Sequence, residues 1–218
     1  MDTCFDSDPN RGPMSKIPQL TLVLVVVSCL ASLLGPAGAA AQRPDRARQI
    51  AAAVLPLPAE LRAAAGVVAL DGRGQPQVWR PSANGMICLA DSPGDSTFDV
   101  RCYQAGFVPV IYRIRQLVAQ DVADSALEGT IDAEIRSGKL PITKAPTAGY
   151  RMYGPVTGYD AARNVVSDRI DAWQSIHLPY RTAASMGLST TEHGIHPYVM
   201  ASGTYWAPVM IMQRPLRY

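Results

Sequence analysis

The stretch that decides the fold is MICLADSPGDSTFDVRCY, residues 86–103. Two strand-like runs, 86–91 and 98–103, flank a run of turn-forming residues, which predicts a β-hairpin with a fairly long connection. Antiparallel pairing centred on Asp95 places Cys88 directly opposite Cys102. In a non-hydrogen-bonded pair the two Cα atoms come within about 4.5 Å, a distance that a disulfide can bridge. The stretch therefore predicts a disulfide between Cys88 and Cys102.

The second strand of this hairpin has two different faces. Alternation along the strand places one set of side chains on each face: Phe98, Val100 and Cys102 on one, and Asp99, Arg101 and Tyr103 on the other. We expect the first face to be buried and the second to be wet.

The flanking segments extend the hairpin into a sheet. Residues 66–71 and 77–80 read as strands joined by a turn, so the first half of the chain predicts an antiparallel meander of four strands. Further strands are expected at residues 150–153, 170–178 and 209–212. In the strand at 170–178, the side chains of Trp173, Ser175 and His177 share one face.

Two helices are expected in the middle of the chain. The first carries an apolar stripe at helical spacing, and the second begins at a capping box of Ser125 and Glu128 and ends at Gly138. The stripe residues are Val110, Ile114, Leu117 and Val118 in the first helix and Leu127, Ile131 and Ile135 in the second. A shorter helix is expected within residues 43–54. The predicted fold class is α+β, a single domain in which an antiparallel sheet carries two central helices.

The N-terminus has the pattern of a signal peptide. An apolar run of 15 residues, 20–34, follows Lys16 and ends in small residues up to Ala41. Residues 1–41 are therefore predicted to be a signal peptide, cut after Ala41 or after Ala39, with Met14 as an alternative start. The mature chain is then 42–218, long enough for one domain with a sizeable core.

Two other readings of the N-terminus stay open. An uncleaved membrane anchor needs about 20 apolar residues, more than this run supplies. Residues 26–29, Val-Val-Ser-Cys, resemble a lipoprotein cleavage box, but the chain stays apolar after Cys29. Membrane contact is expected only through an uncleaved N-terminal segment.

Export bears on the two cysteines of the mature chain. In an oxidising compartment, periplasmic or extracellular, an isolated pair is expected to form a disulfide. The closed loop of 15 residues would stabilise the fold by about 3 kcal/mol in the chain-entropy model. The alternative is that both cysteines are reduced and buried.

Composition excludes some classes of partner. The net charge of +2 is small and its basic residues are scattered, so no nucleic-acid partner is expected. Gly72-x-Gly74 lacks the third glycine of a dinucleotide fingerprint and precedes a strand-like run. No cofactor is predicted.

Several short strings resemble a family of uncharacterised exported bacterial proteins. They are Asn84–Asp91, Pro93–Asp95, Cys102-Tyr103, Leu188–Thr191 and Gly203–Ala207. The resemblance implies an exported single domain with a signal peptide. It implies no activity and no site residues.

Histidines are the first candidates for chemistry. His193 and His196 are three residues apart, which suits a shared metal in a helix or a tight turn, and His177 could complete a three-histidine site. Gly194 and Pro197 disfavour a helix, so this is not the His-Glu-x-x-His arrangement of a metalloprotease. The competing interpretation is a polar loop whose histidines face solvent.

Other catalytic or metal-binding patterns have less support. Ser189 could join a histidine and Asp168 or Asp171 in a triad, but the motif around it lacks the final glycine of a nucleophile elbow. The carboxylates in and beside the hairpin loop, Asp91, Asp95 and Asp99, are spaced somewhat like calcium ligands, yet the loop is half the length of an EF-hand. We interpret them as loop aspartates that face water.

The C-terminal region is the expected binding region. Tyr198, Tyr205 and Trp206 lie in a long segment rich in glycine, serine and threonine, and ordered loops of that kind often form binding surfaces. The leading hypothesis is an exported, non-enzymatic protein with a binding or structural role through this region. The alternative hypothesis is a metal-dependent hydrolase that uses the three histidines.

Overall fold

A computed structural model describes residues 45–213, except 93 and 195. The predicted signal peptide, residues 1–41, lies outside the described residues. Among the described residues, no helix has the length and apolar character that crossing a membrane requires.

Helices and strands follow one another in short groups along the described chain. The strands are β1 (Gly66–Leu70), β2 (Pro76–Arg80), β3 (Met86–Leu89), β4 (Thr97–Gln104), β5 (Thr147–Pro155), β6 (Tyr159–Asp160), β7 (Val165–Val166), β8 (Asp171–His177), β9 (Tyr198–Val199) and β10 (Pro208–Gln213). The helices are α2 (Arg46–Ala53), α3 (Ala59–Arg62), α4 (Val108–Ala119), α5 (Asp124–Arg136) and α6 (Ala183–Met186), with a 3-10 turn η1 (Val156–Gly158).

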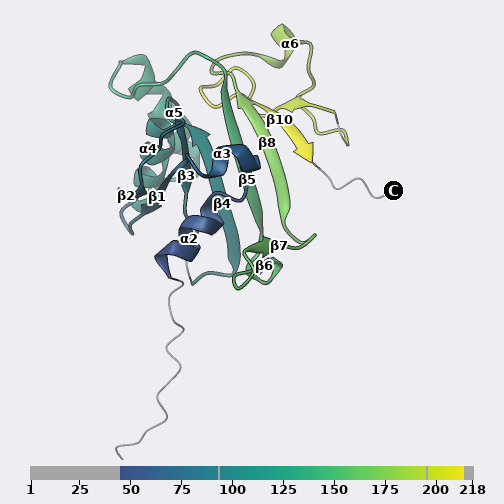
Figure 1. Cartoon of the computed structure of the whole chain (residues 1–218). Coiled ribbons are helices and arrows are strands. Elements are labelled where there is room, and N and C mark those ends of the chain that lie inside the picture. The colour runs from purple at the N-terminus through teal and green to yellow at the C-terminus, as the bar shows by residue number, and fades with distance from the viewer. Residues whose placement is uncertain (1–44, 93, 195, 214–218) are drawn as a thin grey trace, which may run out of the picture. The chain divides into compact units, whose positions relative to one another are not determined.

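An eight-stranded sheet in the order β2-β1-β3-β4-β5-β8-β10-β9 organises the fold, and β6 pairs with β7 in a separate small sheet. The hairpin of β3 and β4 has the predicted register, with Cys88 paired with Cys102. Beyond it, β4, β5, β8 and β10 are neighbours in antiparallel order (Figure 1).

The predicted antiparallel meander of four strands is wrong at one point. β1 pairs antiparallel with β2 but parallel with β3, so β2 is an edge strand and the sheet is mixed. After β2 the chain crosses beside the start of β1, where Ala83 N–H donates to the Ala64 carbonyl at 2.8 Å. A side chain on Gly66 would lie 2.9 Å from Ser82 Cβ. Glycine at position 66 therefore makes room for the crossing.

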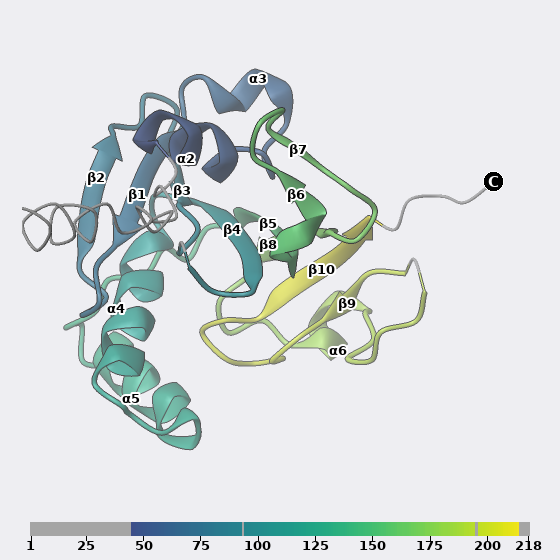
Figure 2. The same cartoon turned by 90° about the horizontal axis from the view of Figure 1, so that it is seen from below.

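The helices cover the two faces of the sheet unequally. Seen from below, α2 and α3 lie on one side of the sheet, and α4 and α5 lie on the other (Figure 2). α4 packs on the sheet through Val108 and Ile111, which contact Val68 and Leu89. α5 packs on α4 instead, through Ile131. The α+β class is confirmed, but only one of the two central helices packs directly on the sheet.

The predicted stripes describe α4 and α5 well, with two corrections. Val110, Leu117 and Ile131 are buried, whereas Val118 is 46% exposed and Ile111 takes its place in the core. The capping-box prediction is wrong, because α5 begins at Asp124 with Ala123 as its N-cap and no side-chain cap. Ser125 therefore lies inside the helix.

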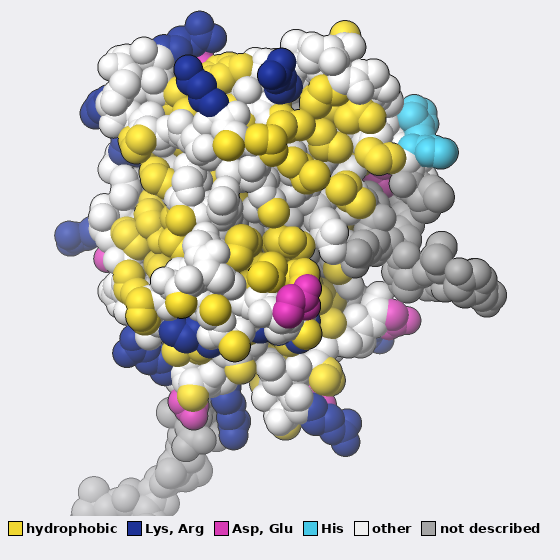
Figure 3. Space-filling view, turned by 45° about the horizontal axis from the view of Figure 1, so that its top comes forward, with side chains coloured by type: hydrophobic (Ala, Val, Ile, Leu, Met, Phe, Trp, Pro, Cys, Tyr) yellow, Lys and Arg dark blue, Asp and Glu magenta, His cyan; other side chains and the backbone are white. Residues whose placement is uncertain are grey.

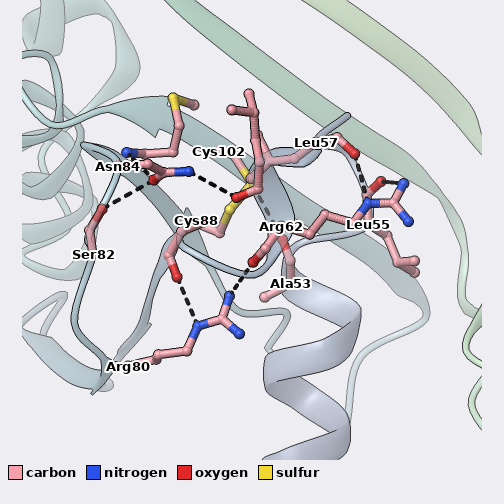
Figure 4. Close-up of a disulfide and its surroundings, with 12 residues drawn as sticks. Ala53, Leu55, Leu57, Arg62, Arg80, Ser82, Asn84, Cys88 and Cys102 are labelled. Atoms are coloured by element: carbon pink, nitrogen blue, oxygen red, sulfur yellow. Dashed lines mark hydrogen bonds between the residues drawn. A yellow bond between two sulfur atoms is a disulfide. The ribbon is translucent and has the colours of Figure 1, made fainter. Parts of the chain in front are cut away.

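The Cys88–Cys102 disulfide lies at the centre of the other face. Both cysteines are completely buried, and their Cα atoms are 3.9 Å apart. Cys102 Sγ lies 3.4 Å from the carbonyl oxygen of Ala53, at the end of α2 (Figure 4). The disulfide prediction is confirmed, and the bond joins the hairpin beneath α2.

Arginine side chains bind the connection between α2 and β1 to the sheet. Arg62 donates to the carbonyls of Leu57 and Leu55 at 2.7 and 2.9 Å. Arg80 of β2 donates to the carbonyls of Ala65 and Arg62 at 2.8 and 2.7 Å. These bonds surround the disulfide in Figure 4 and satisfy backbone oxygens that no strand or helix pairs.

Removing the disulfide should destabilise the protein strongly. The double variant Cys88→Ala/Cys102→Ala should lose about 3 kcal/mol of unfolding free energy, since the closed loop no longer limits the unfolded chain. Urea denaturation followed by circular dichroism measures the loss. The unsubstituted protein treated with reductant is the control and should match the double variant. Identical urea midpoints with and without reductant would contradict the prediction.

Candidate functional site

A pocket of about 120 Å³ lies on the face of the sheet that α4 partly covers. We call it the sheet-face pocket. Strands β4, β5 and β8 supply most of its polar and aromatic lining, which includes Arg101, Tyr103, Arg151, Trp173, Ser175 and His177. These residues fall in neighbouring cross-strand rows, because Arg101 pairs with Arg151 and Arg151 with Trp173. The alternation of three strands therefore brings this set to one face.

The segment Met200–Ala207, which we call the C-terminal cover, forms one side of the pocket. Met200 and Trp206 contribute lining side chains, together with Pro208 and Met210 of β10. The cover is tied to the chain after β8 by backbone bonds, Tyr180 N–H to the Thr204 carbonyl at 2.7 Å and Gly203 N–H to the Arg181 carbonyl at 2.9 Å. These hydrogen bonds fix the C-terminal cover beside the pocket.

Asp99 accepts two arginine forks beside the pocket. Arg101 donates to both carboxylate oxygens through Nε and Nη2, and Arg151 does the same at 2.9 and 3.0 Å. Burial alone would raise the pKa of Asp99, but the hydrogen bonds from Arg101 and Arg151 outweigh it and lower the pKa to about 2. Asp99 is therefore ionised at neutral pH and holds both guanidinium groups in place.

Ser175 and His177 form a neutral pair in the lining. Ser175 Oγ lies 3.2 Å from His177 Nε2, and His177 Nδ1 lies 3.2 Å from the carbonyl oxygen of Trp206. A carbonyl only accepts, so the proton is on Nδ1 and Nε2 is an acceptor. The Ser175 hydroxyl has two acceptors within reach, His177 Nε2 at 3.2 Å and the Gly149 carbonyl oxygen at 3.4 Å. Burial lowers the pKa of His177 to about 4, although the bond to Trp206 opposes this.

This geometry resembles a nucleophile and its base, but its electrostatics disfavour proton transfer. The third partner is a backbone carbonyl, whereas the histidine of a serine hydrolase has a carboxylate that stabilises the imidazolium. A histidine whose pKa is about 4 is a weak base at neutral pH. The pair is better suited to supply a neutral, polar part of the pocket wall.

The three histidines are not brought together. His177 is buried, and its ring packs 4.3 Å from that of Phe107 and 4.9 Å from that of Trp206. His193 and His196 are exposed in a turn closed by His196 N–H donating to the His193 carbonyl at 3.1 Å. Histidine side chains lie at one edge of the surface in Figure 3. Across the described ranges, no group of three His, Cys, Asp or Glu residues is arranged to hold a metal ion.

The three aromatic residues expected to bind have different positions. Trp206 lines the sheet-face pocket, whereas Tyr205 is buried in the cluster between α4 and α5. Burial raises the pKa of Tyr205 to about 12. Tyr198 is half-buried and pairs with Met210 in the ladder of β9 and β10. Of the three, only Trp206 lies where it could contact a ligand in this pocket.

The triad and calcium hypotheses find no support in the geometry. Ser189 is exposed, and its hydroxyl accepts the Thr191 N–H at 2.9 Å. Asp95 accepts hydrogen bonds from Thr97, and Asp99 binds the two arginines. Asp91 accepts the Asp99 N–H at 3.0 Å, and burial raises its pKa to about 6. These aspartates therefore make hydrogen bonds within or beside the hairpin. Asp91 and Asp99 are partly buried, whereas all three were expected to face water.

Larger hollows of about 220 to 330 Å³ also occur. Each borders Asp91 and Ser92, next to residue 93, which is outside the described residues. The hollow of about 270 Å³ has four aspartates in its lining besides Arg101 and Arg115. The sheet-face pocket is described completely and has a distinct chemical character, so it is the better candidate.

Comparisons of the chain with protein-family models, with curated proteins and with solved structures found no match.

Gly149 provides the space for the Ser175–His177 pair. A Cβ at this position would lie 2.6 Å from Ser175 Oγ and 2.9 Å from His177 Nε2. Gly149→Ala should therefore lower the unfolding free energy by about 1–3 kcal/mol through overpacking. The control Gly129→Ala, in α5 with open space around its Cβ, should raise it by about 0.5–1 kcal/mol. Equal effects in thermal denaturation would contradict this role of Gly149.

Asp99 should make stability depend on pH below about 4. Its folded pKa of about 2 is below its ordinary value of 3.8, so its contribution is complete above pH 4 and is lost as pH falls toward 2. We expect Asp99→Asn to be about 2 kcal/mol less stable than the natural protein at pH 7. That difference should shrink between pH 4 and pH 2. Urea denaturation across this range measures it, and a constant difference would contradict the prediction.

Proposed function

We propose that the protein is exported and binds a small molecule in the sheet-face pocket, without converting it chemically. The observation that carries this proposal is a half-open pocket, lined by aromatic and arginine side chains, between the sheet and the C-terminal cover. Pockets that bind small molecules are concave, mostly apolar and equipped with a few placed polar groups. Export is supported by the pattern of residues 1–41 and by the buried disulfide.

The volume of the pocket limits the part of a ligand that can enter it. A dry protein cavity of about 150 Å³ accepts benzene, and the sheet-face pocket measures about 120 Å³. Tyr103, Trp173 and Trp206 place aromatic groups in its lining, and aromatic side chains favour flat ligands. The pocket is smaller than that cavity but open on one side, so one flat ring, or the end of a longer molecule, can enter it in part.

Tryptophan fluorescence can test the proposal directly. Trp173 and Trp206 line the pocket, whereas Trp79 lies on β2 beside Arg46. We expect members of a library of one-ring compounds, including acidic, neutral and basic ones, to shift the emission. Trp206→Ala should weaken their binding by about tenfold or more, because it removes a wall of the pocket.

Trp79→Phe is the matched control and should leave the affinities unchanged. Circular dichroism of both variants checks that they fold. If no compound of any charge binds, or if binding is the same in Trp206→Ala, the sheet-face pocket is not a ligand site.

A further inference from the structure

Arg151 is held rigidly at the sheet-face pocket. Its guanidinium carbon lies 4.5 Å from the ring centroid of Tyr153 and 4.9 Å from that of Trp173. Its Nε and Nη2 donate to Asp99. Contact with aromatic rings and a bidentate carboxylate together restrict a side chain that is otherwise flexible. Arg151 is therefore preorganised before any ligand arrives.

Some N–H groups of Arg151 remain without an acceptor in this arrangement. A guanidinium has five N–H groups, and the fork to Asp99 uses two of them in Arg151. In the part of the chain that the structure describes, the other three have no hydrogen-bond acceptor. The indole N–H of Trp173 is also buried without a partner there. Unused donors of this kind favour a ligand that only accepts hydrogen bonds.

Positive charge exceeds negative charge around the pocket. Its lining includes Arg101 and Arg151 but no carboxylate, and Asp99 supplies a single negative charge to both. A third guanidinium, Arg115, is close enough to act on them: burial and then Arg101 lower its pKa. The Arg115 side chain makes no hydrogen bond or salt bridge with the described residues. It lines the neighbouring hollow, where Asp99 acts to raise its pKa. Half-buried cations in excess of their carboxylates are stabilised when an anion binds.

The same excess of positive charge acts on the hydroxyl of Tyr103. Burial raises the pKa of Tyr103, while Arg101, Arg151 and Arg115 all act to lower it. Three arginines from three elements, β4, β5 and α4, thus direct positive charge toward one phenol in the pocket wall. Positive charge and aromatic rings therefore occur together at the sheet-face pocket.

We propose that the ligand is a small oxyanion, a carboxylate or a phosphate, carried on a flat apolar group. Its oxygens accept hydrogen bonds from the free N–H groups of Arg151, near the positive charge of Arg101, and its flat part lies against Trp206. This inference rests on the proposed binding function and specifies the class of ligand. The arginine fork matches the geometry of both oxyanions.

Four probes that share a phenyl ring distinguish the effect of ligand charge on affinity from the effect of ligand shape. They are benzoate, phenyl phosphate, benzamide and benzylamine. Fluorescence titration of the full-length purified protein should show benzoate or phenyl phosphate binding about tenfold or more tightly than the neutral and cationic probes. The tighter of the two anions distinguishes a carboxylate site from a phosphate site. Raising the salt concentration should weaken the binding of the two anions more than the binding of benzamide.

Arg151→Gln should remove most of this preference while benzamide binds as before. Arg151→Lys, which keeps the charge but not the fork, should retain part of the preference. Arg163→Gln is the matched control, because Arg163 is 82% exposed in a surface pair with Asp160, and it should change nothing.

The outcomes separate this inference from the proposed function. Equal or tighter binding of benzamide or benzylamine overturns the anion inference and leaves the pocket as a ligand site. An anion preference that survives Arg151→Gln in folded protein also overturns it. Failure of all four probes, repeated across the wider library, overturns both.

Discussion

The register of β4 is the constraint on which the rest of the structure depends. Phe98, Val100 and Cys102 of this strand lie in the core on the side of α2. On the opposite face, Arg101 and Tyr103 line the sheet-face pocket and Asp99 lies beside it. A shift of one residue would exchange the two sets and bury Asp99 and Arg101 under α2. The covalent bond from Cys102 to Cys88 excludes that shift. Thus the disulfide that stabilises one face also determines which residues form the other.

The two faces place different demands on the same strands. Toward α2, apolar side chains and sulfur fill a dry core in which Cys88, Cys102 and Val100 are completely buried. Toward the pocket, Asp99, Arg101 and Arg151 retain about a fifth to a quarter of their side-chain exposure. That partial burial strengthens their electrostatic interactions without the full cost of desolvating an isolated charge. The charged site is therefore supported on the opposite face of the sheet by a fully buried core.

Local patterns predicted much of this arrangement. Turn residues and alternation identified the hairpin and its disulfide, and periodicity located α4 and α5. Alternation also placed Trp173, Ser175 and His177 together, and all three line the pocket. The second face of β4 was expected to be wet, yet Tyr103 is only 6% exposed. Phe107 and α4 pack on it from nearby in the chain, and Trp206 packs on it from about a hundred positions later, a contact that local patterns do not reveal.

Long-range pairing accounts for what the sequence could not predict. Arg151 reaches Asp99 across 52 positions of the chain, and no local spacing signals that meeting. The parallel pairing of β1 with β3 likewise depends on a crossing beside Gly66. Spacing of histidines suggested a metal, but spacing says nothing of burial, and burial under Phe107 and Trp206 gave His177 a different environment. The chemistry of this site thus arises from the sheet order, which aligns a carboxylate, its arginines and the aromatic rings in adjacent rows.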